Sequence, residues 1–469
     1  MPLERATDRR SVLLVAATAS FLTPFMGSSI NIALASIARE FGVDAVSLGW
    51  VSTAYTLAAA AFLVPFGRLA DIVGRRKVFV AGVLTYALST ILSATSVSAT
   101  MLIACRALEG AGSALIFGTG TAMLTSVYPP QERGRVLGIN VATTYVGLSI
   151  GPTVGGLLTQ YWSWRGIFWV TMPLAVLIAF LAMWQIKGEW AEARGEAFDL
   201  PGSTLYGLAL VALMYGLSSL PKVSGAWLLG LGVAGLVAFV LWEVRAKSPV
   251  LEIGLFRENT VFALSNLAAW ANYGATTAVG LLLSLYLQYI KGLDPRSAGA
   301  IMVAQPIVMA LFSPLAGRLS DRFEPRVVAS AGMALTVVGL VMLTTLGEGT
   351  SLAFVTACLV LLGLGFGLFS SPNTNAIMGS VDRRRYGLAS GMVGTMRLTG
   401  QMFSMGMTML VFALHIGRVQ IAPESYGRFL ESARIIFSGS AILCTAGVVA
   451  SLARGKLHRK ELREPARGG

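Results

Sequence analysis

The sequence is poor in charge. Asp, Glu, Lys and Arg together make up 13% of its 469 residues, about half of the ~25% that is usual for soluble globular domains. Hydrophobic residues make up 55%, and the mean hydropathy is +0.70. Because so few charges cannot cover the water-exposed surface of a chain this long, the composition excludes a soluble enzyme, a disordered chain and a disulfide-stapled secreted module. It indicates a membrane protein.

Residues that carry catalytic or metal chemistry are also scarce. The chain has two histidines and three cysteines, and each cysteine lies inside an apolar run. These numbers and spacings support no His-based metal centre, disulfide framework or zinc site. The motifs G-x-x-x-x-G-K-[ST] and H-E-x-x-H are missing as well. We therefore expect no cofactor, no ATP-driven motor and no enzyme, and a process driven by an ion or substrate gradient.

Apolar segments recur along the whole chain, and a membrane-spanning helix needs only about 20 such residues. Because lipid offers no partner to backbone donors, each spanning segment must be a helix. The first segment follows MPLERATDRR without a cleavage site, so we expect it to be retained. The fourteen predicted spans are 11–36, 47–66, 78–96, 99–127, 136–160, 165–186, 202–220, 225–243, 259–289, 297–316, 326–346, 351–379, 386–414 and 429–453.

The distribution of Lys and Arg predicts the orientation of these spans. With the N-terminus in the cytoplasm, cytoplasmic segments hold 26 basic residues, the other side holds 8, and two lie within spans. This asymmetry follows the positive-inside rule and accounts for the net charge of +13 without nucleic acid. An even span number returns the C-terminus to the cytoplasm. Short loops and the lack of Asn-x-Ser/Thr sequons favour the cytoplasmic membrane of a prokaryote.

The chain contains an internal repeat. Gly67-Arg68-Leu69-Ala70-Asp71 after the second span returns as Gly317-Arg318-Leu319-Ser320-Asp321 after the tenth, 250 residues later. The repeat predicts a six-helix N-terminal unit (1–200), two inserted helices (201–256) and a six-helix C-terminal unit with a basic tail (257–469). Duplicated halves around a midplane cavity are typical of secondary transporters.

The segment from Gly67 to Lys77 resembles the loop motif G-x-L-a-D-r-x-G-R-[RK] of the major facilitator superfamily. The resemblance implies the major facilitator fold and a cytoplasmic gate formed by Gly67, Asp71, Arg75 and Arg76. Gly317 and Asp321 hold the equivalent places in the second copy. We expect Gly67 to let two helices approach closely and Asp71 to pair with a cation of a neighbouring helix. The alternative is a basic loop that only sets the orientation.

The fourth predicted span contains Arg106 and Glu109, three residues apart and therefore on one helical face. Ionisable groups inside a span are costly and often mark a transport pathway. The segment resembles the superfamily pattern R-x-x-Q-G-x-G, with Glu109 where Gln is usual. Glu109 is therefore either a proton carrier or only the counterion of Arg106.

The fifth predicted span contains Gly147, Gly151, Pro152 and Gly155 and resembles the superfamily's antiporter motif, g-x-x-x-G-P-x-x-G-G. Glycines four residues apart form a stripe that permits close helix contact, and proline removes a backbone donor and kinks the helix. We expect a bending surface where the two halves meet. The resemblance implies an exporter that exchanges its substrate for protons; generic glycine packing is the alternative.

With an inserted central pair, the chain is most similar to the 14-spanner drug:proton antiporter family. That family has an acid in its first span, associated with proton coupling and cationic substrates, and Met26 stands at that place. The candidate substrate-binding residues, all polar or aromatic groups inside predicted spans, are Asn31, Asn272, Tyr273, Arg397 and Gln401.

These features together predict a proton-coupled exporter of small hydrophobic or amphipathic compounds that works by alternating access. Its partners would be a small-molecule substrate, protons and the lipid bilayer, and we expect it to function as a monomer. One alternative is a carrier of an anionic metabolite held by Arg397. Another is a transport-inactive membrane receptor or scaffold.

Overall fold

A computed structural model describes residues 9–246, 249–251, 253–381, 386–417 and 419–455, and this part of the chain is helical, with no strand. The N-terminal helices are α1 (Arg9–Phe41), α2 (Ala45–Val73), α3 (Arg75–Ala94), α4 (Ala99–Val127), α5 (Pro130–Tyr161) and α6 (Arg165–Gln185). The inserted pair is α7 (Leu200–Ser219) and α8 (Val223–Glu243). Then come α9 (Gly254–Glu258), α10 (Thr260–Leu285), the π-helical turn η1 (Tyr286–Ile290), α11 (Pro295–Met302), α12 (Ala304–Arg322), α13 (Pro325–Leu343), α14 (Leu352–Gly379), α15 (Tyr386–His415) and α16 (Tyr426–Ala453).

Each predicted span coincides with a helix or a pair of helices, because continuous apolar runs leave the backbone no other way to satisfy its hydrogen bonds in lipid. The largest difference lies at the end of α2. The motif residues Gly67–Asp71, expected in a loop, form the last turns of this helix, which ends only at Gly74. Gly74 has a φ of +128°, a conformation that glycine adopts readily.

Within the described ranges, twelve segments are long and apolar enough to cross a membrane, and one of them, Pro295–Ser320, joins α11 and α12. The helices α10 and α15 are 26 and 30 residues long but do not reach the same hydropathy. The protein is thus a multi-pass all-α membrane protein. Fourteen spans and two cytoplasmic termini stay predictions.

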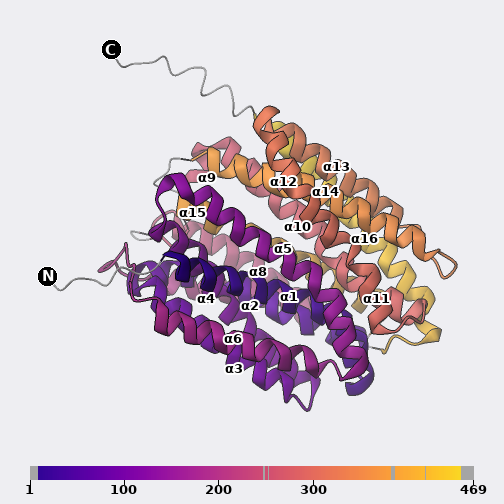
Figure 1. The fold of residues 1–469 in the computed structure, drawn as a ribbon. Helices are drawn as coiled ribbons and strands as arrows, with labels where there is room; N and C mark the ends of the chain where they lie inside the picture. Colours follow the sequence, from indigo (N-terminus) through magenta and orange to yellow (C-terminus); the bar gives the residue numbers. More distant parts are fainter. Residues whose placement is uncertain (1–8, 247–248, 252, 382–385, 418, 456–469) are drawn as a thin grey trace.

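The helix packing repeats between the two halves of the chain. In the N-terminal half α1 packs on α5 and α6, α4 packs on α2 and α3, and α3 packs on α6. In the C-terminal half α10 packs on α15 and α16, α14 packs on α12 and α13, and α13 packs on α16. Each pair has its counterpart in the other half, and Figure 1 shows the two bundles side by side. Of the inserted pair, α7 packs against α2 of one half and α15 of the other, and α8 packs on α7.

The two halves are held together most closely at one end. We call the end where α1 begins and α16 ends the inner end, and the opposite end the outer end (Figure 1). Near the outer end Ser284 donates to the carbonyl oxygen of Asn31 at 2.6 Å, and Gln288 donates to that of Ile32 at 2.9 Å. The helices α5 and α11 are in contact there as well. The structure therefore shows a state that is closed at its outer end.

Candidate transport site

The most buried charged residues of the N-terminal half form an ion pair on α4. Arg106 Nη1 lies 2.7 Å from Glu109 Oε2, and the two side chains are 1% and 0% exposed. Arg106 Nε also donates to the carbonyl oxygen of Val51, and the guanidinium lies over the ring of Tyr55 at 4.5 Å. The second carboxylate oxygen, Glu109 Oε1, has no hydrogen-bond partner. The pair is therefore charge-balanced but leaves one buried oxygen free to accept a proton.

The glycines that follow this pair explain its burial. A Cβ atom on Gly110 would overlap the carbonyl of Tyr55 on α2, and one on Gly112 would lie 2.8 Å from the backbone nitrogen of Tyr86 on α3. Only glycine lets α4 approach both neighbours so closely. The buried hydroxyl of Tyr86 makes no hydrogen bond of normal length, and Glu109 is the acceptor within its reach.

A second cluster lies where the two halves face each other. Arg397 on α15 places its half-buried guanidinium 4.8 Å from the ring of Phe117 on α4. No ion pair joins Arg397 to an acid within the part of the chain that the structure describes. Tyr145 on α5 bonds to Ser370 on α14 at 3.2 Å. The cluster thus combines one unpaired cation with aromatic and hydroxyl groups of both halves.

The structure separates the predicted substrate-binding residues. Tyr273 lies within electrostatic reach of Arg397, and Gln401 is one helical turn from that arginine. Asn31 accepts from Ser52 at 3.4 Å, nearer the outer end. Asn272 is fully buried between α10 and α16, where its oxygen accepts a weak bond from the thiol of Cys444. Asn272 therefore faces the packing of its own half in this state.

Some residues of the facing cluster carry no signal in the sequence. Phe117, Tyr145 and Ser370 stand as single aromatic or hydroxyl residues in apolar helices, where such residues usually serve packing. Only the repeat, which places α4, α5 and α14 next to the other half, could have drawn attention to them.

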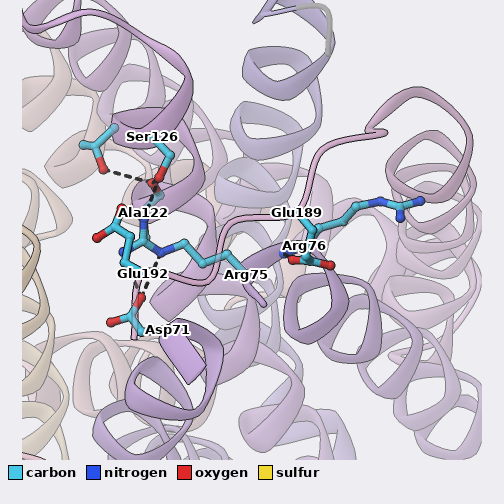
Figure 2. Close-up of polar contacts among 8 residues, drawn as sticks. Asp71, Arg75, Arg76, Ala122, Ser126, Glu189 and Glu192 are labelled. Atoms are coloured by element: carbon cyan, nitrogen blue, oxygen red, sulfur yellow. Dashed lines mark hydrogen bonds and ion pairs between the residues drawn. The ribbon is translucent and has the colours of Figure 1, made fainter. Parts of the chain in front are cut away.

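The loop motif between α2 and α3 is held by a network around Arg75 (Figure 2). The guanidinium of Arg75 pairs with Asp71 and with Glu192, both at 2.8 Å, and donates to Ser126 Oγ at 2.5 Å. Asp71 thus has the expected cation partner from a neighbouring helix. The second acid, Glu192, comes from the segment after α6, which the sequence analysis did not connect with this motif.

The same segment also holds Arg76 (Figure 2). The backbone nitrogen of Arg76 donates to Glu189 at 2.9 Å, and its guanidinium donates to the carbonyl of Met183 at 2.8 Å. Arg68, at the end of α2, pairs with Glu196. Three acids between α6 and α7 therefore bind the three arginines of the motif. We call this set of contacts the latch, and all of its residues belong to the N-terminal half.

The two motif glycines differ in their surroundings. A Cβ on Gly317 would lie 3.1 Å from Ser371 Oγ of α14, but one on Gly67 would meet nothing within 4 Å. Gly67 nevertheless lies where α2 approaches α4, because a Cβ on Gly118 would lie 3.5 Å from its Cα atom. Asp321 belongs to α12, and its side chain lies outside the described part.

The glycines of the antiporter motif form the expected close contacts. Added Cβ atoms on Gly147, Gly151 and Gly155 would overlap α1, the last two at Ser28 and Ser29. Ser29 also donates to the carbonyl oxygen of Gly151 at 2.9 Å.

One turn of α5 reaches the other half. A Cβ on Gly299 of α11 would overlap the carbonyl of Pro152, and one on Gly156 would lie 2.5 Å from the carbonyl of Pro295. The motif therefore carries one contact face toward α1 of its own half and another toward α11 of the C-terminal half; bending at this surface stays a prediction.

Comparison with known proteins identifies the family. The sequence profile of the Major Facilitator Superfamily matches residues 16–242 and 266–468. The chain belongs to the major facilitator superfamily. Its fold agrees, because a bacterial homologue of the human lysosomal transporter Spinster, solved in an inward-facing and unoccupied conformation, superimposes with a TM-score of 0.71 at 15% identity. That match covers 98% of this chain and 99% of the other.

Relatives with described functions carry different small molecules. The riboflavin transporter RibZ of Clostridioides difficile is 29% identical over 82% of this chain and 84% of its own. The multidrug resistance protein Stp of Mycobacterium tuberculosis is 33% identical over 79% and 70%. The cephamycin export protein CmcT of Amycolatopsis lactamdurans is 32% identical over 87% and 86%. This superfamily member is therefore a membrane transporter of small molecules and not an enzyme.

Proposed function

We propose that this protein is a proton-coupled exporter of small hydrophobic or amphipathic compounds in the cytoplasmic membrane, and that it works as a monomer by alternating access. The observation that carries the proposal is Glu109, a fully buried carboxylate with one oxygen on Arg106 and the other without a partner. The names of Stp and CmcT support export of drug-like compounds.

The geometry suggests how a proton would be taken up. In the present state the Arg106–Glu109 pair is sealed between α2, α3 and α4, so water does not reach the free oxygen. Arg106 is also held by the carbonyl of Val51 and the ring of Tyr55, both on α2. A shift of α2 relative to α4 within the N-terminal half, coupled to the change of state, would loosen these contacts. The carboxylate then gains access to water and can be protonated.

The test is proton-driven efflux from proteoliposomes for a panel of neutral and charged amphipathic dyes, with and without a pH gradient. Glu109→Gln keeps the shape and a hydrogen-bond acceptor but removes the group that can take up a proton. We therefore expect it to abolish the response to the pH gradient. Glu348→Gln, at an exposed residue near the outer end, is the matched control.

The double variant Arg106→Gln/Glu109→Gln tests the same role without an unbalanced buried charge. Gradient-driven efflux that survives in both variants would reject Glu109 as the proton carrier.

A second candidate function is transport of an organic anion, favoured by the unpaired Arg397 between the halves. A guanidinium with free donors can bind a carboxylate through two parallel hydrogen bonds. In this case Arg397→Gln would remove transport of anionic members of the panel and spare the neutral ones. Equal loss of both classes would assign Arg397 to the packing of α4 and α15. Flux of no compound at all would favour the receptor or scaffold alternative.

A further inference from the structure

A cavity of about 600 Å³ opens at the outer end, away from the facing cluster and the ion pair on α4. Its walls come from both halves. The N-terminal half contributes Arg39 of α1 and Gln160 of α5, and the C-terminal half contributes η1 and the segments before α11 and α16. Its volume lies within the range of ~300–1,000 Å³ that is typical of small-molecule sites. We call this space the outer vestibule.

One polar atom of the outer vestibule lacks a hydrogen-bond partner. Gln288, in the π-helical turn, is 5% exposed; its nitrogen donates to Ile32 and to Ser284, but its oxygen has no hydrogen-bond partner. Leaving such an acceptor unpaired costs about 1–3 kcal/mol. Gln288 thus brings an unpaired acceptor to the wall of the outer vestibule, and a ligand with an N–H or O–H group can pair with it when the amide turns toward the cavity.

The charged side chains of the outer vestibule differ in whether they already have a partner or can bind a ligand. Asp294 already accepts from the backbone and the hydroxyl of Ser297, as the cap of α11. The neighbouring Glu40 binds Arg165. Arg39 forms no ion pair in the described part of the chain; its guanidinium lies 5.9 Å from the ring of Tyr289 and within hydrogen-bond reach of the hydroxyl of that residue. A ligand would therefore place a negative group against Arg39 and an apolar or aromatic body against the tyrosine.

We propose that the outer vestibule is a second ligand site, distinct from the transport pathway, for small aromatic anions that also carry a hydrogen-bond donor. Such a ligand contacts α1 and α5 on one side and η1 on the other in the outer-closed state. It binds that state better than one in which the halves separate, and it shifts the population accordingly. A ligand that enters the outer vestibule from outside therefore inhibits transport, because it stabilises the closed outer end. This last consequence, unlike the binding itself, rests on the proposed alternating access.

The test uses 4-aminobenzoate, which combines a carboxylate, a ring and an amine donor. Equilibrium binding of the radiolabelled compound is measured on the full-length protein in lipid nanodiscs. We expect saturable binding that Arg39→Gln weakens about tenfold or more, the effect of losing one charge-assisted hydrogen bond. Arg39→Lys keeps the charge and restores part of the affinity. Arg434→Gln, which removes an arginine that donates to Thr344 near the same end, leaves binding unchanged.

A second measurement separates this site from the transport pathway. Spin labels at Val97 and Gly349, exposed in equivalent outer loops of the two halves, report the width of the outer end. We expect 4-aminobenzoate to reduce the population with a long distance, and Arg397→Gln to leave this effect intact. The proposal is overturned if the protein does not bind the compound saturably, if Arg39→Gln binds as tightly as the parent protein, or if Arg397→Gln removes the binding.

Discussion

At the scale of single residues, the Arg106–Glu109 pair makes a sharp prediction about stability. Removing one partner of a buried pair leaves an uncompensated charge and typically costs about 3–5 kcal/mol. We expect Glu109→Gln to lower the free energy of unfolding by an amount in that range. The double variant Arg106→Gln/Glu109→Gln should recover most of it, because no buried charge is left. Thermal unfolding of the purified variants measures both effects.

This cycle also distinguishes the two roles that the sequence leaves open for Glu109. A double variant that is stable but uncoupled from protons is expected of a proton carrier. A double variant that is stable and still coupled would make Glu109 only the counterion of Arg106. A double variant as unstable as Glu109→Gln would show that the hydrogen bond of Arg106 to Val51 and its cation–π contact with Tyr55, not charge balance, dominate the energetics of this site.

Arg75 allows a second prediction at this scale. Its guanidinium is 8% exposed and contacts Asp71, Glu192 and Ser126 at once. Hydrogen bonds to charged groups contribute about 1.5–3 kcal/mol, but the two acids are partly exposed and screened. We expect Arg75→Gln to lower the free energy of unfolding by about 1–3 kcal/mol and to expose the 187–199 segment to protease. Lys77→Gln, at an exposed neighbour, is the control, and equal proteolysis of the two variants would contradict the latch.

At the scale of elements, the glycine stripe of α5 contains its own control. A Cβ on Gly151 would overlap Ser28 of α1, but one on Gly138 of the same helix would meet nothing within 4 Å. We expect Gly151→Ala to destabilise the protein by about 1–3 kcal/mol through overpacking. Gly138→Ala should stabilise it by about 0.5–1 kcal/mol because alanine loses less backbone entropy in a helix. Similar melting temperatures for the two variants would show that α1 shifts enough to accommodate the added methyl group at position 151.

The elements also show what the sequence could and could not predict. The helices follow from apolar length, since lipid leaves no alternative, and the tight contacts of Gly151 follow from spacing four. The end of α2 was misplaced, because Arg68 and Asp71 are polar yet continue the helix to Gly74. The pairing of Arg75 with Glu192 could not be foreseen. The two residues are 117 positions apart in the sequence. Their pairing depends on how the segment after α6 folds back onto α3, and no local sequence pattern determines that path.

At the scale of the whole molecule, the repeat predicted the two-bundle architecture, but the state of the molecule depends on contacts between the bundles. Asn272 shows this limit. Its residue type suited a cavity wall, whereas the rotation of α10 turns it toward Cys444. Periodicity cannot fix such a rotation for a helix that is buried on most sides. The free energy difference between outer-closed and outer-open states is equally invisible in the sequence.

One substitution should shift that balance. A Cβ on Gly299 of α11 would overlap the carbonyl of Pro152 on α5, a contact between the halves that helps close the outer end. The clash exists only while the halves touch there, so Gly299→Ala penalises the outer-closed state and leaves the outer-open state unaffected. A penalty of about 1–3 kcal/mol changes the ratio of the two states by about 5- to 150-fold.

We expect spin labels at Val97 and Gly349 to report a larger long-distance population in Gly299→Ala than in the parent protein. Gly439→Ala, in α16 where a Cβ meets nothing within 4 Å, is the matched control and should leave the distances unchanged. If Gly299→Ala only lowers the melting temperature and the distance distribution stays the same, the α5–α11 contact persists in both states. The two bundles would then have to rock about this contact as a fixed pivot, with their opening confined to the inner end.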